Sequence, residues 1–300
     1  MATSLAPWPA PGAVLQLLKP ITWFPPMWAF ACGVVSSGIP PDRHWPVIAL
    51  GIFLAGPMVC ATSQAVNDWF DRHVDAINEP DRPIPSGRIP GRWGLNIAIL
   101  WTALSLAVAA LLGPWVLAAA TLGLVLAWLY SAPPIRLKQN GWWGNTAVGL
   151  CYEGLPWVTG AAVMLGSGAP RTEVLLLAGL YSLGAHGIMT LNDFKSMRGD
   201  ARMGIASLPV QLGAQGAAWL ACAVMAFPQA IVVALLLGWG VPLHALAVAA
   251  LLTIQLLLMW RFLQKPVERA TWYSALGVNF YVLGMLISAF AVGAMARGGA

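Results

Sequence analysis

Long stretches without a charged residue recur along the whole chain, and they limit its possible folds more than any other feature. Charged residues make up 9% of the 300 positions, whereas hydrophobic residues make up 59%. A helix that crosses the ~30 Å hydrocarbon core of a bilayer needs about 20 predominantly apolar residues. Within lipid, only helices and closed barrels satisfy every backbone hydrogen bond. The sequence therefore predicts an all-α integral membrane protein.

Nine apolar segments have about the length of a membrane-spanning helix. Short breaks at Gly113-Pro114 and Gly238-Trp239-Gly240 separate neighbouring segments and predict helical hairpins there. The predicted spans cover residues 21–38, 47–69, 95–112, 115–132, 144–165, 173–194, 214–237, 241–263 and 273–296. We therefore expect residues 1–300 to form a single polytopic domain, a nine-helix bundle.

The basic residues fall almost entirely on one side of this topology. Only three of the 16 Lys and Arg residues, namely Arg43, Arg171 and Arg297, lie on the other side. The remaining thirteen are Lys19, Arg72, Arg82, Arg88, Arg92, Arg136, Lys138, Lys195, Arg198, Arg202, Arg261, Lys265 and Arg269. Loops rich in Lys and Arg stay in the cytoplasm, so the N-terminus is predicted to be cytoplasmic. The net charge of +5 then needs no nucleic-acid partner.

Most acidic residues form two clusters, each at the cytoplasmic end of an even-numbered predicted helix. The first acidic cluster reads Asn67-Asp68-Trp69-Phe70-Asp71-Arg72-His73-Val74-Asp75 and places three carboxylates at i, i+3 and i+7. In a helix these residues share one face, where like charges repel each other unless a cation lies between them. Mg²⁺ binds through one or two carboxylates together with substrate phosphates. A diphosphate is therefore the natural bridging ligand.

The second acidic cluster reads Asn192-Asp193-Phe194-Lys195-Ser196-Met197-Arg198-Gly199-Asp200. Asp193 and Asp200 stand at i and i+7 and would share a helical face, although Gly199 favours a helix end nearby. We expect the two clusters to hold Mg²⁺ and a diphosphate together. The predicted metal ligands are Asn67, Asp68, Asp71, Asp193 and Asp200, and Asp75 completes the predicted catalytic set.

A proline-rich loop from Asn78 to Arg88 follows the first acidic cluster and carries two arginines. Guanidinium groups bind phosphate bidentately and stay charged, so Arg82 and Arg88 are predicted to hold the diphosphate. The other residues predicted to bind it are Arg72, Asn78, Lys138, Lys195 and Arg198. A single charge beside the membrane is more often simply solvated, and Arg136 and Lys138 are explained equally well as anchors on the cytoplasmic side.

At its first acidic cluster the chain resembles the UbiA superfamily of intramembrane prenyltransferases, whose first signature is Asn-Asp-x-x-Asp-x-x-x-Asp. Here that signature runs from Asn67 to Asp75. Members are nine-helix bundles with a cavity open sideways to lipid. In these proteins, two Asp-rich motifs on the second and sixth helices bind Mg²⁺ and a prenyl diphosphate. The resemblance implies the same fold and ligands for this chain.

Four longer phrases are similar to those of the chlorophyll and bacteriochlorophyll synthases within that superfamily. They are Lys19 to Pro26, Asp81 to Arg88, Tyr152 to Trp157 and Leu191 to Ser196. The resemblance implies a transferase of a bacterial inner membrane. It would join geranylgeranyl or phytyl diphosphate to the propionate carboxylate of bacteriochlorophyllide a. The subgroup usually has Glu where Arg198 stands, so metal binding at the second cluster depends on Asp193 and Asp200, with Asn192 as a further candidate.

Three residues are candidates for contact with the tetrapyrrole or for the wall of the cavity. Glu153 lies within a predicted span, where a carboxylate is costly enough to suggest a function, although it could instead cap backbone freed by Pro156. His186 stands seven residues before Asp193 and could ligate the metal of a tetrapyrrole. A polar contact between helices is the commoner use of such a histidine. Tyr130, near the end of the fourth predicted span, is the third candidate.

Other functions remain open at this stage. A chlorophyll synthase or another aromatic prenyltransferase would use the same acidic motifs, although Ser196 and the phrase from Tyr152 to Trp157 favour the synthase subgroup. A membrane transporter also has polar residues within interrupted helices, but its site belongs near the bilayer midplane. The acidic residues here gather at one membrane face instead. An acceptor carboxylate is already ionised near pH 7, which agrees with the lack of an obvious catalytic dyad.

Overall fold

The computed structural model describes residues 8–298, which form a bundle of α-helices with no β-strand in that range. Eight helical segments in this range are long and apolar enough to cross a membrane. Two of them, Trp45–Asn78 and Gly141–Leu165, each combine two α-helices that a π-helical segment joins. A shorter apolar helix, Phe24–Ser36, accompanies them. The prediction of an all-α membrane protein is confirmed. The nine predicted spans correspond to these eight long helices and the one short helix.

The helices follow one another along the chain with few residues between them. They are α1 (Pro11–Leu18), α2 (Phe24–Ser36), α3 (Trp45–Phe53), α4 (Ala61–Asn78), α5 (Trp93–Leu112), α6 (Pro114–Ser131), α7 (Gly141–Gly149), α8 (Leu155–Leu165), α9 (Thr172–Asp193), α10 (Met197–Met203), α11 (Leu208–Gly238), α12 (Pro242–Gln264) and α13 (Pro266–Gly298). Three single turns of 3₁₀-helix, η1 (Pro20–Thr22), η2 (Pro41–Arg43) and η4 (Leu137–Gln139), lie in the connections.

Two of the spanning helices contain a π-helical segment. The segment η3 (Leu54–Cys60) joins α3 to α4, and η5 (Leu150–Gly154) joins α7 to α8. Pro57 lies inside η3, where a proline cannot donate its backbone hydrogen bond. The indole of Trp101 donates to the Pro57 carbonyl oxygen at 3.1 Å. Segments of this kind are frequent at functional sites, and both lie close to the site described below.

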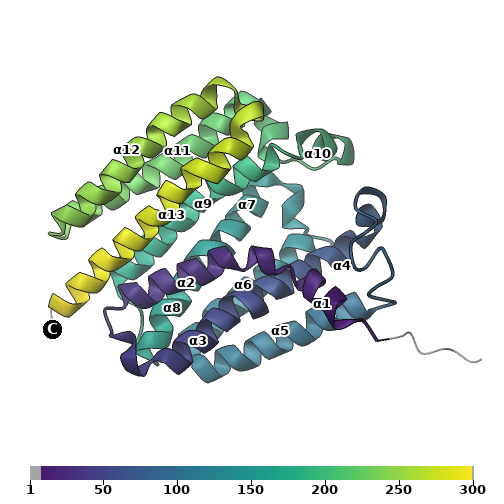
Figure 1. The fold of residues 1–300 in the computed structure, drawn as a ribbon, viewed down its shortest axis with the longest axis horizontal. Coiled ribbons are helices and arrows are strands. Elements are labelled where there is room, and N and C mark those ends of the chain that lie inside the picture. The colour runs from purple at the N-terminus through teal and green to yellow at the C-terminus, as the bar shows by residue number, and fades with distance from the viewer. Residues whose placement is uncertain (1–7, 299–300) are drawn as a thin grey trace, which may run out of the picture.

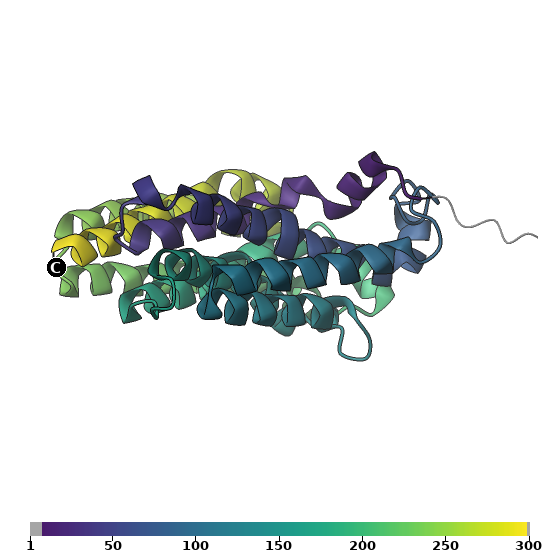
Figure 2. The same cartoon turned by 90° about the horizontal axis from the view of Figure 1, so that it is seen from below.

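Figures 1 and 2 show which elements gather at each end of the bundle. In Figure 1, α11, α12 and α13 lie together on one side, and α3 and α5 lie on the other. The helices α1 and α10 and the loop after α4 gather at one end, whereas the C-terminus lies at the opposite end. Figure 2 shows α1 and that loop at the same end from a perpendicular direction.

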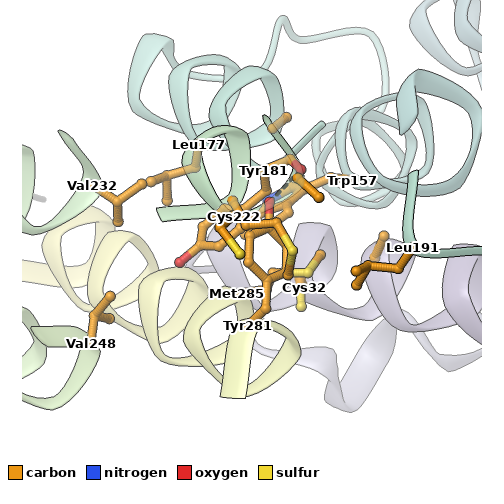
Figure 3. Close-up of a cluster of buried hydrophobic side chains, with 14 of the residues drawn as sticks. Cys32, Trp157, Leu177, Tyr181, Leu191, Cys222, Val232, Val248, Tyr281 and Met285 are labelled. Carbon is orange, nitrogen blue, oxygen red and sulfur yellow. Dashed lines mark hydrogen bonds between the residues drawn. The ribbon is translucent and has the colours of Figure 1, made fainter. Parts of the chain in front are cut away.

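The largest buried cluster joins α2, α8, α9, α11 and α13 (Figure 3). Trp157 stacks on Tyr181 with ring centroids 5.5 Å apart, and Tyr181 meets Tyr281 edge-on at 5.2 Å. The Tyr281 hydroxyl donates to the Tyr181 carbonyl oxygen at 2.5 Å. The Trp157 indole donates to Ser36 Oγ at 3.1 Å. These aromatic side chains therefore bury large apolar surfaces while their polar atoms stay hydrogen-bonded.

Helices α2 and α8 meet through their backbones at two glycines. A Cβ atom added to Gly33 would lie 2.0 Å from the carbonyl oxygen of Trp157. One added to Gly160 would lie 2.0 Å from the carbonyl oxygen of Phe30. Small residues let membrane helices approach this closely. The two glycines therefore set the distance between α2 and the helix that continues η5.

Several helices extend beyond the apolar segments that predicted them. The predicted span 47–69 continues as α4 to Asn78, and the last predicted span, 273–296, begins at Pro266. Hydropathy detects only the part of a helix that lies in lipid, whereas the helix itself continues through polar turns. Proline is compatible with the first helical turn, which explains the helix starts at Pro242 and Pro266.

Candidate functional site

Asp68 and Asp75 of α4 lie on one face of the helix, and both are buried beside basic side chains. Nη1 of Arg82, in the following loop, lies 3.3 Å from Asp68 Oδ1 and 2.9 Å from Asp75 Oδ2. Lys19, directly after α1, places its Nζ atom 2.6 Å from the same Asp68 oxygen. The i, i+7 spacing of these carboxylates therefore produces a shared face, and two basic side chains cover it.

Asp71 pairs with a different set of cations. Both of its carboxylate oxygens contact Lys138, and Nη2 of Arg136 lies 3.2 Å from Oδ1. Asn67 donates to Asp71 Oδ2 at 3.1 Å and to Ser131 Oγ at 3.2 Å. Burial lowers the pKa of Lys138 below the usual value of a lysine, although the Asp71 carboxylate opposes this effect. The ammonium group is thus held in a partly desolvated position beside a carboxylate.

Two of these cationic residues have an unusual backbone conformation. Within residues 8–298, Lys19 and Arg136 are the two non-glycine residues with positive φ angles, 46° and 42°. Such conformations cost energy for a residue with a side chain, and they cluster at functional sites. Each of these residues pairs with a carboxylate of the first acidic cluster. The loops therefore hold both cations against the cluster despite the backbone strain.

The second acidic cluster differs from the predicted continuous helix face. Helix α9 ends at Asp193 and α10 begins only at Met197, so Asp193 and Asp200 belong to different helices. Asn145 of α7 donates to Asp193 Oδ2 at 3.1 Å, and Ser196 donates to Asp200 Oδ2 at 2.7 Å. A turn after Asp193, rather than helical periodicity, therefore brings the two carboxylates to the same space.

A polar cavity of about 370 Å³ lies between the two acidic clusters. Asp71 and Asp75 line it from α4, and Asp193 and Asp200 line it from α9 and α10. Lys138 also contributes to its wall. The fold thus brings carboxylates from two distant parts of the sequence around one volume, together with a cation that can pair with an anionic ligand.

A second, mostly apolar cavity of about 390 Å³ shares Tyr130 with the polar cavity. Asn67 and Asn192, from the two acidic clusters, also line it. Its apolar wall consists of Pro25, Leu126, Ala127, Ala147, Val148, Cys151 and Met189. Concave apolar sites with a few fixed polar groups are typical of ligand pockets. The two cavities together suit an amphiphile that has an anionic head and a hydrocarbon tail.

The donor atoms at the first acidic cluster fit a hard divalent cation. Asp68 Oδ2 is buried and has no hydrogen-bond partner among the described residues. Such buried polar atoms are uncommon in folded proteins and need an explanation, for instance an ion. Between Trp8 and Gly298, no three His, Cys, Asp or Glu side chains form a metal site by themselves. Mg²⁺ bound here would therefore take part of its coordination from a substrate, which is its usual mode.

Two arginines predicted to bind diphosphate make contacts of another kind. The Arg72 guanidinium lies 4.1 Å from the centre of the Trp69 ring and donates to the Trp69 carbonyl oxygen at 2.6 Å. Arg88 donates to Gln16 Oε1 at 2.6 Å and to the Asp81 carbonyl oxygen at 2.5 Å. Arg88 therefore joins the loop after α4 to α1, whereas the Arg72 contacts stay within α4. Neither arginine lines the two cavities.

The remaining predicted residues are divided between the cavity wall, the surface and the core. Asn78 lines the polar cavity, whereas Lys195 and Arg198 are exposed beside it. Glu153 and His186 are buried, but neither belongs to the lining of the two cavities. Glu153 Oε2 and His186 Nδ1 each lack a hydrogen-bond partner within the described residues. Both side chains therefore belong to the helix packing behind the site.

Sequence reasoning missed three residues that contact the acidic carboxylates. Lys19 and Asn145 hold Asp68 and Asp193, and Ser196 holds Asp200. Asn145 carried a signal, since a polar side chain within an apolar span is itself a reason to suspect a function. No spacing rule connects Lys19 with Asp68, because the two residues are 49 positions apart.

Comparison with known proteins gives consistent results. The sequence matches the UbiA prenyltransferase family over residues 22–294. The bacteriochlorophyll synthase 33 kDa chain of Cereibacter sphaeroides is 59% identical over 284 residues, which cover 95% of this chain and 94% of that protein. The chloroplastic chlorophyll synthase of Oryza sativa subsp. japonica is 40% identical and covers 92% of this chain, with 76% of its own length matched.

A solved structure supports the same fold. The UbiA homologue from Archaeoglobus fulgidus, bound to GPP and Mg²⁺, matches this structure with a TM-score of 0.66. The match covers 91% of this chain and 99% of the homologue, at 20% sequence identity. At that identity the similarity shows a common helical architecture.

Proposed function

This chain belongs to the UbiA prenyltransferase family, and we propose that it esterifies the propionate carboxylate of bacteriochlorophyllide a with geranylgeranyl or phytyl diphosphate. This is the reaction of a bacteriochlorophyll synthase. The observation that carries the proposal is the 59% identity to a protein of that name, which extends over 95% of the chain. Both acidic clusters lie within the matched family region. The substrates, the metal and the site residues below are parts of the proposal.

The carboxylates of the two clusters would hold Mg²⁺. The proposed ligands are Asp68, Asp71, Asp193 and Asp200, with Asn67 beside them. When bound, Mg²⁺ neutralises negative charge that develops on the departing diphosphate. In support, Asp68 Oδ2 has a free lone pair, and the polar cavity is lined by carboxylates of both clusters.

The basic side chains would bind and orient the diphosphate. Lys19 and Arg82 share Asp68, and Arg136 and Lys138 share Asp71. With these carboxylates bound to a metal, the four cations would be able to donate to phosphate oxygens instead. Charge-assisted hydrogen bonds of this type are about twice as strong as neutral ones. The cations would thus bind the diphosphate of the donor and stabilise its negative charge when it leaves.

The acceptor reacts without a general base. A propionate is ionised near pH 7, so one of its oxygens attacks C1 of the prenyl group as the bond between C1 and the diphosphate oxygen breaks. The electron pair of that bond leaves with the diphosphate, and no proton moves. The apolar cavity surrounds the reacting carbon and excludes water, which would otherwise give the free prenyl alcohol.

A membrane location suits both substrates. The apolar cavity measures about 390 Å³, near the small end of the range of about 300–1,000 Å³ found for ligand pockets. It is suited to the reacting ends of the donor and acceptor, while the rest of each molecule extends into lipid. We place the protein in a bacterial inner membrane, with the N-terminus and the polar cavity at the cytoplasmic face.

The test uses membranes that contain this protein, supplied with bacteriochlorophyllide a, geranylgeranyl diphosphate and Mg²⁺. Extracted pigments are separated by chromatography. We expect a geranylgeranyl ester that requires Mg²⁺ and is lost in the double variant Asp68→Ala, Asp71→Ala. Asp42→Ala is the control, because Asp42 is an exposed carboxylate in η2 that lines neither cavity. An ester formed from chlorophyllide but not from bacteriochlorophyllide, or a prenylated quinone precursor alone, would overturn the proposal.

A further inference from the structure

The wall of the apolar cavity carries a hydrogen-bonded pair that contacts none of the acidic carboxylates. Gln64 of α4 donates from Nε2 to the hydroxyl oxygen of Tyr152 at 3.2 Å, and both side chains line the cavity. Cys60 Sγ lies 3.6 Å from the same oxygen, while its thiol can donate to the Thr22 carbonyl oxygen at 3.4 Å. Polar side chains inside a membrane are costly and usually mark a substrate pathway or site. This pair is therefore a candidate for contact with a substrate.

The Tyr152 proton has only a weak acceptor, a sulfur atom, within the side chains that hold it. A phenol donates one hydrogen bond and accepts others. The Tyr152 oxygen accepts from Gln64, and its own proton can reach Cys60 Sγ, a weak acceptor at 3.6 Å. The hydroxyl can therefore donate to a ligand in the cavity. It suits an oxygen acceptor such as a carboxylate.

The pair lies at the depth where the chemistry has to occur. Gln64 precedes Asp68 by four residues in α4, so it lies roughly 6 Å deeper along the helix axis. Tyr152 faces it from the π-helical segment η5. A diphosphate held at the acidic clusters has its prenyl chain directed into the apolar cavity. Its first carbon then lies about one helical turn below Asp68, beside Gln64 and Tyr152.

We propose that Tyr152, oriented by Gln64, forms the acceptor subsite. Its hydroxyl donates to one oxygen of the acceptor carboxylate and thereby directs the other oxygen to C1 of the prenyl group. Tyr152 keeps its proton throughout, since the new bond joins the free carboxylate oxygen to C1 while the bond to diphosphate breaks. This role rests on the proposed function, which supplies a carboxylate acceptor. Tyr152 and Gln64 are specificity-determining residues in this scheme.

The experiment compares Tyr152→Phe and Gln64→Leu with the control Thr253→Ala. Thr253 is exposed on α12, lines neither cavity, and donates to the Ala249 carbonyl oxygen of its own helix at 2.8 Å. Binding of bacteriochlorophyllide a to the purified protein in detergent is followed through the pigment's absorbance, without any prenyl donor. The KM values for both substrates and the ratio of pigment ester to free prenyl alcohol are then measured.

We expect Tyr152→Phe to weaken acceptor binding and raise the acceptor KM roughly tenfold, the loss of one hydrogen bond to a charged group. The donor KM should stay unchanged, and more of the donor should be lost as prenyl alcohol. Gln64→Leu should shift the same quantities in the same direction, and Thr253→Ala should match the wild type. A purely structural role of Tyr152 would lower the thermal stability and affect both substrates alike.

Two results would overturn the inference. In the first, Tyr152→Phe and Gln64→Leu bind the acceptor as the wild type does. In the second, only the donor KM rises, which would mean that the phenol contacts the prenyl diphosphate. A failure of the proposed function looks different, because the wild type itself would then neither bind nor esterify bacteriochlorophyllide a. Tyr152→Phe keeps the aromatic ring, so a role of the ring alone would give the first of these two results.

Discussion

The guanidinium of Arg82 lies 2.9 Å from the carboxylate of Asp75, seven residues earlier in the chain. It also reaches Asp68 at 3.3 Å and Glu79 at 2.5 Å. A lysine offers a single ammonium group instead of the planar fork that makes these contacts. We expect Arg82→Lys to lower kcat/KM for the prenyl diphosphate roughly 10- to 100-fold, since it weakens charge stabilisation at the leaving group.

Arg88 supplies the control for this prediction. It lies in the same loop, but its guanidinium is bound to Gln16 and to the Asp81 carbonyl oxygen. Steady-state kinetics with varied donor concentration should show a much smaller loss for Arg88→Lys than for Arg82→Lys. Equal losses would mean that the loop acts as a whole and that Arg82 has no special role.

Asn145 is expected to act through Asp193. It donates to Asp193 Oδ2 at 3.1 Å and to Thr190 Oγ1 at 3.3 Å. Loss of a partner that orients a metal ligand typically costs about 10- to 100-fold in metal affinity. Asn145→Ala should therefore raise the Mg²⁺ concentration for half-maximal activity by a factor in that range.

The control for the Mg²⁺ titration is Asn279→Ala. Asn279 is exposed on α13 and bonds only its own helix, at the Ala275 carbonyl oxygen. Its variant should keep the Mg²⁺ dependence of the wild type. If Asn145→Ala lost activity at every Mg²⁺ concentration without a shift in the midpoint, Asn145 would support the fold rather than the metal site.

Lys138 should set an alkaline limit on activity. Burial lowers its pKa below the usual value of a lysine. Below that pKa the ammonium is charged and can bind an anion, and above it the charge is lost. We expect kcat/KM for the donor to fall as pH rises through the lowered pKa, because this quantity reports ionisation of the free enzyme. Lys138→Arg should move the fall to higher pH, since arginine stays protonated. An identical alkaline limb in both proteins would exclude Lys138 as its source.

The contact between α2 and α8 should depend on Gly33. A Cβ atom at this position would lie 2.0 Å from the Trp157 carbonyl oxygen and 2.8 Å from the Ala161 nitrogen. Overpacking of this kind costs about 1–3 kcal/mol, occasionally more. We expect Gly33→Ala to lower the thermal unfolding midpoint in detergent. Gly179→Ala, in α9 with nothing within 4 Å of the added atom, should leave it unchanged or raise it slightly. Equal midpoints for both variants would show that the helices can separate at little cost.

The sequence by itself determined the features that depend on neighbouring residues. Apolar length determined the membrane-spanning helices, because a segment without charges is stable in lipid wherever it packs. Helical periodicity determined that Asp68 and Asp75 share a face, since α4 continues as one helix to Asn78. The same rule did not apply to Asp193 and Asp200, because α9 ends at Asp193 and the chain turns before α10 begins at Met197.

Only the tertiary structure decided which distant residues complete the site. Lys19 reaches Asp68 across 49 positions, Lys138 reaches Asp71 across 67, and Gln64 reaches Tyr152 across 88. Each contact depends on how the helices pack, and packing is set by close approaches such as that at Gly33, which no local pattern specifies. Glu153 shows the converse, because its position within an apolar span suggested the cavity, whereas packing placed it behind the wall. The local sequence therefore determines where each helix forms and which residues share a face. The packing of side chains between helices determines which residues contact one another.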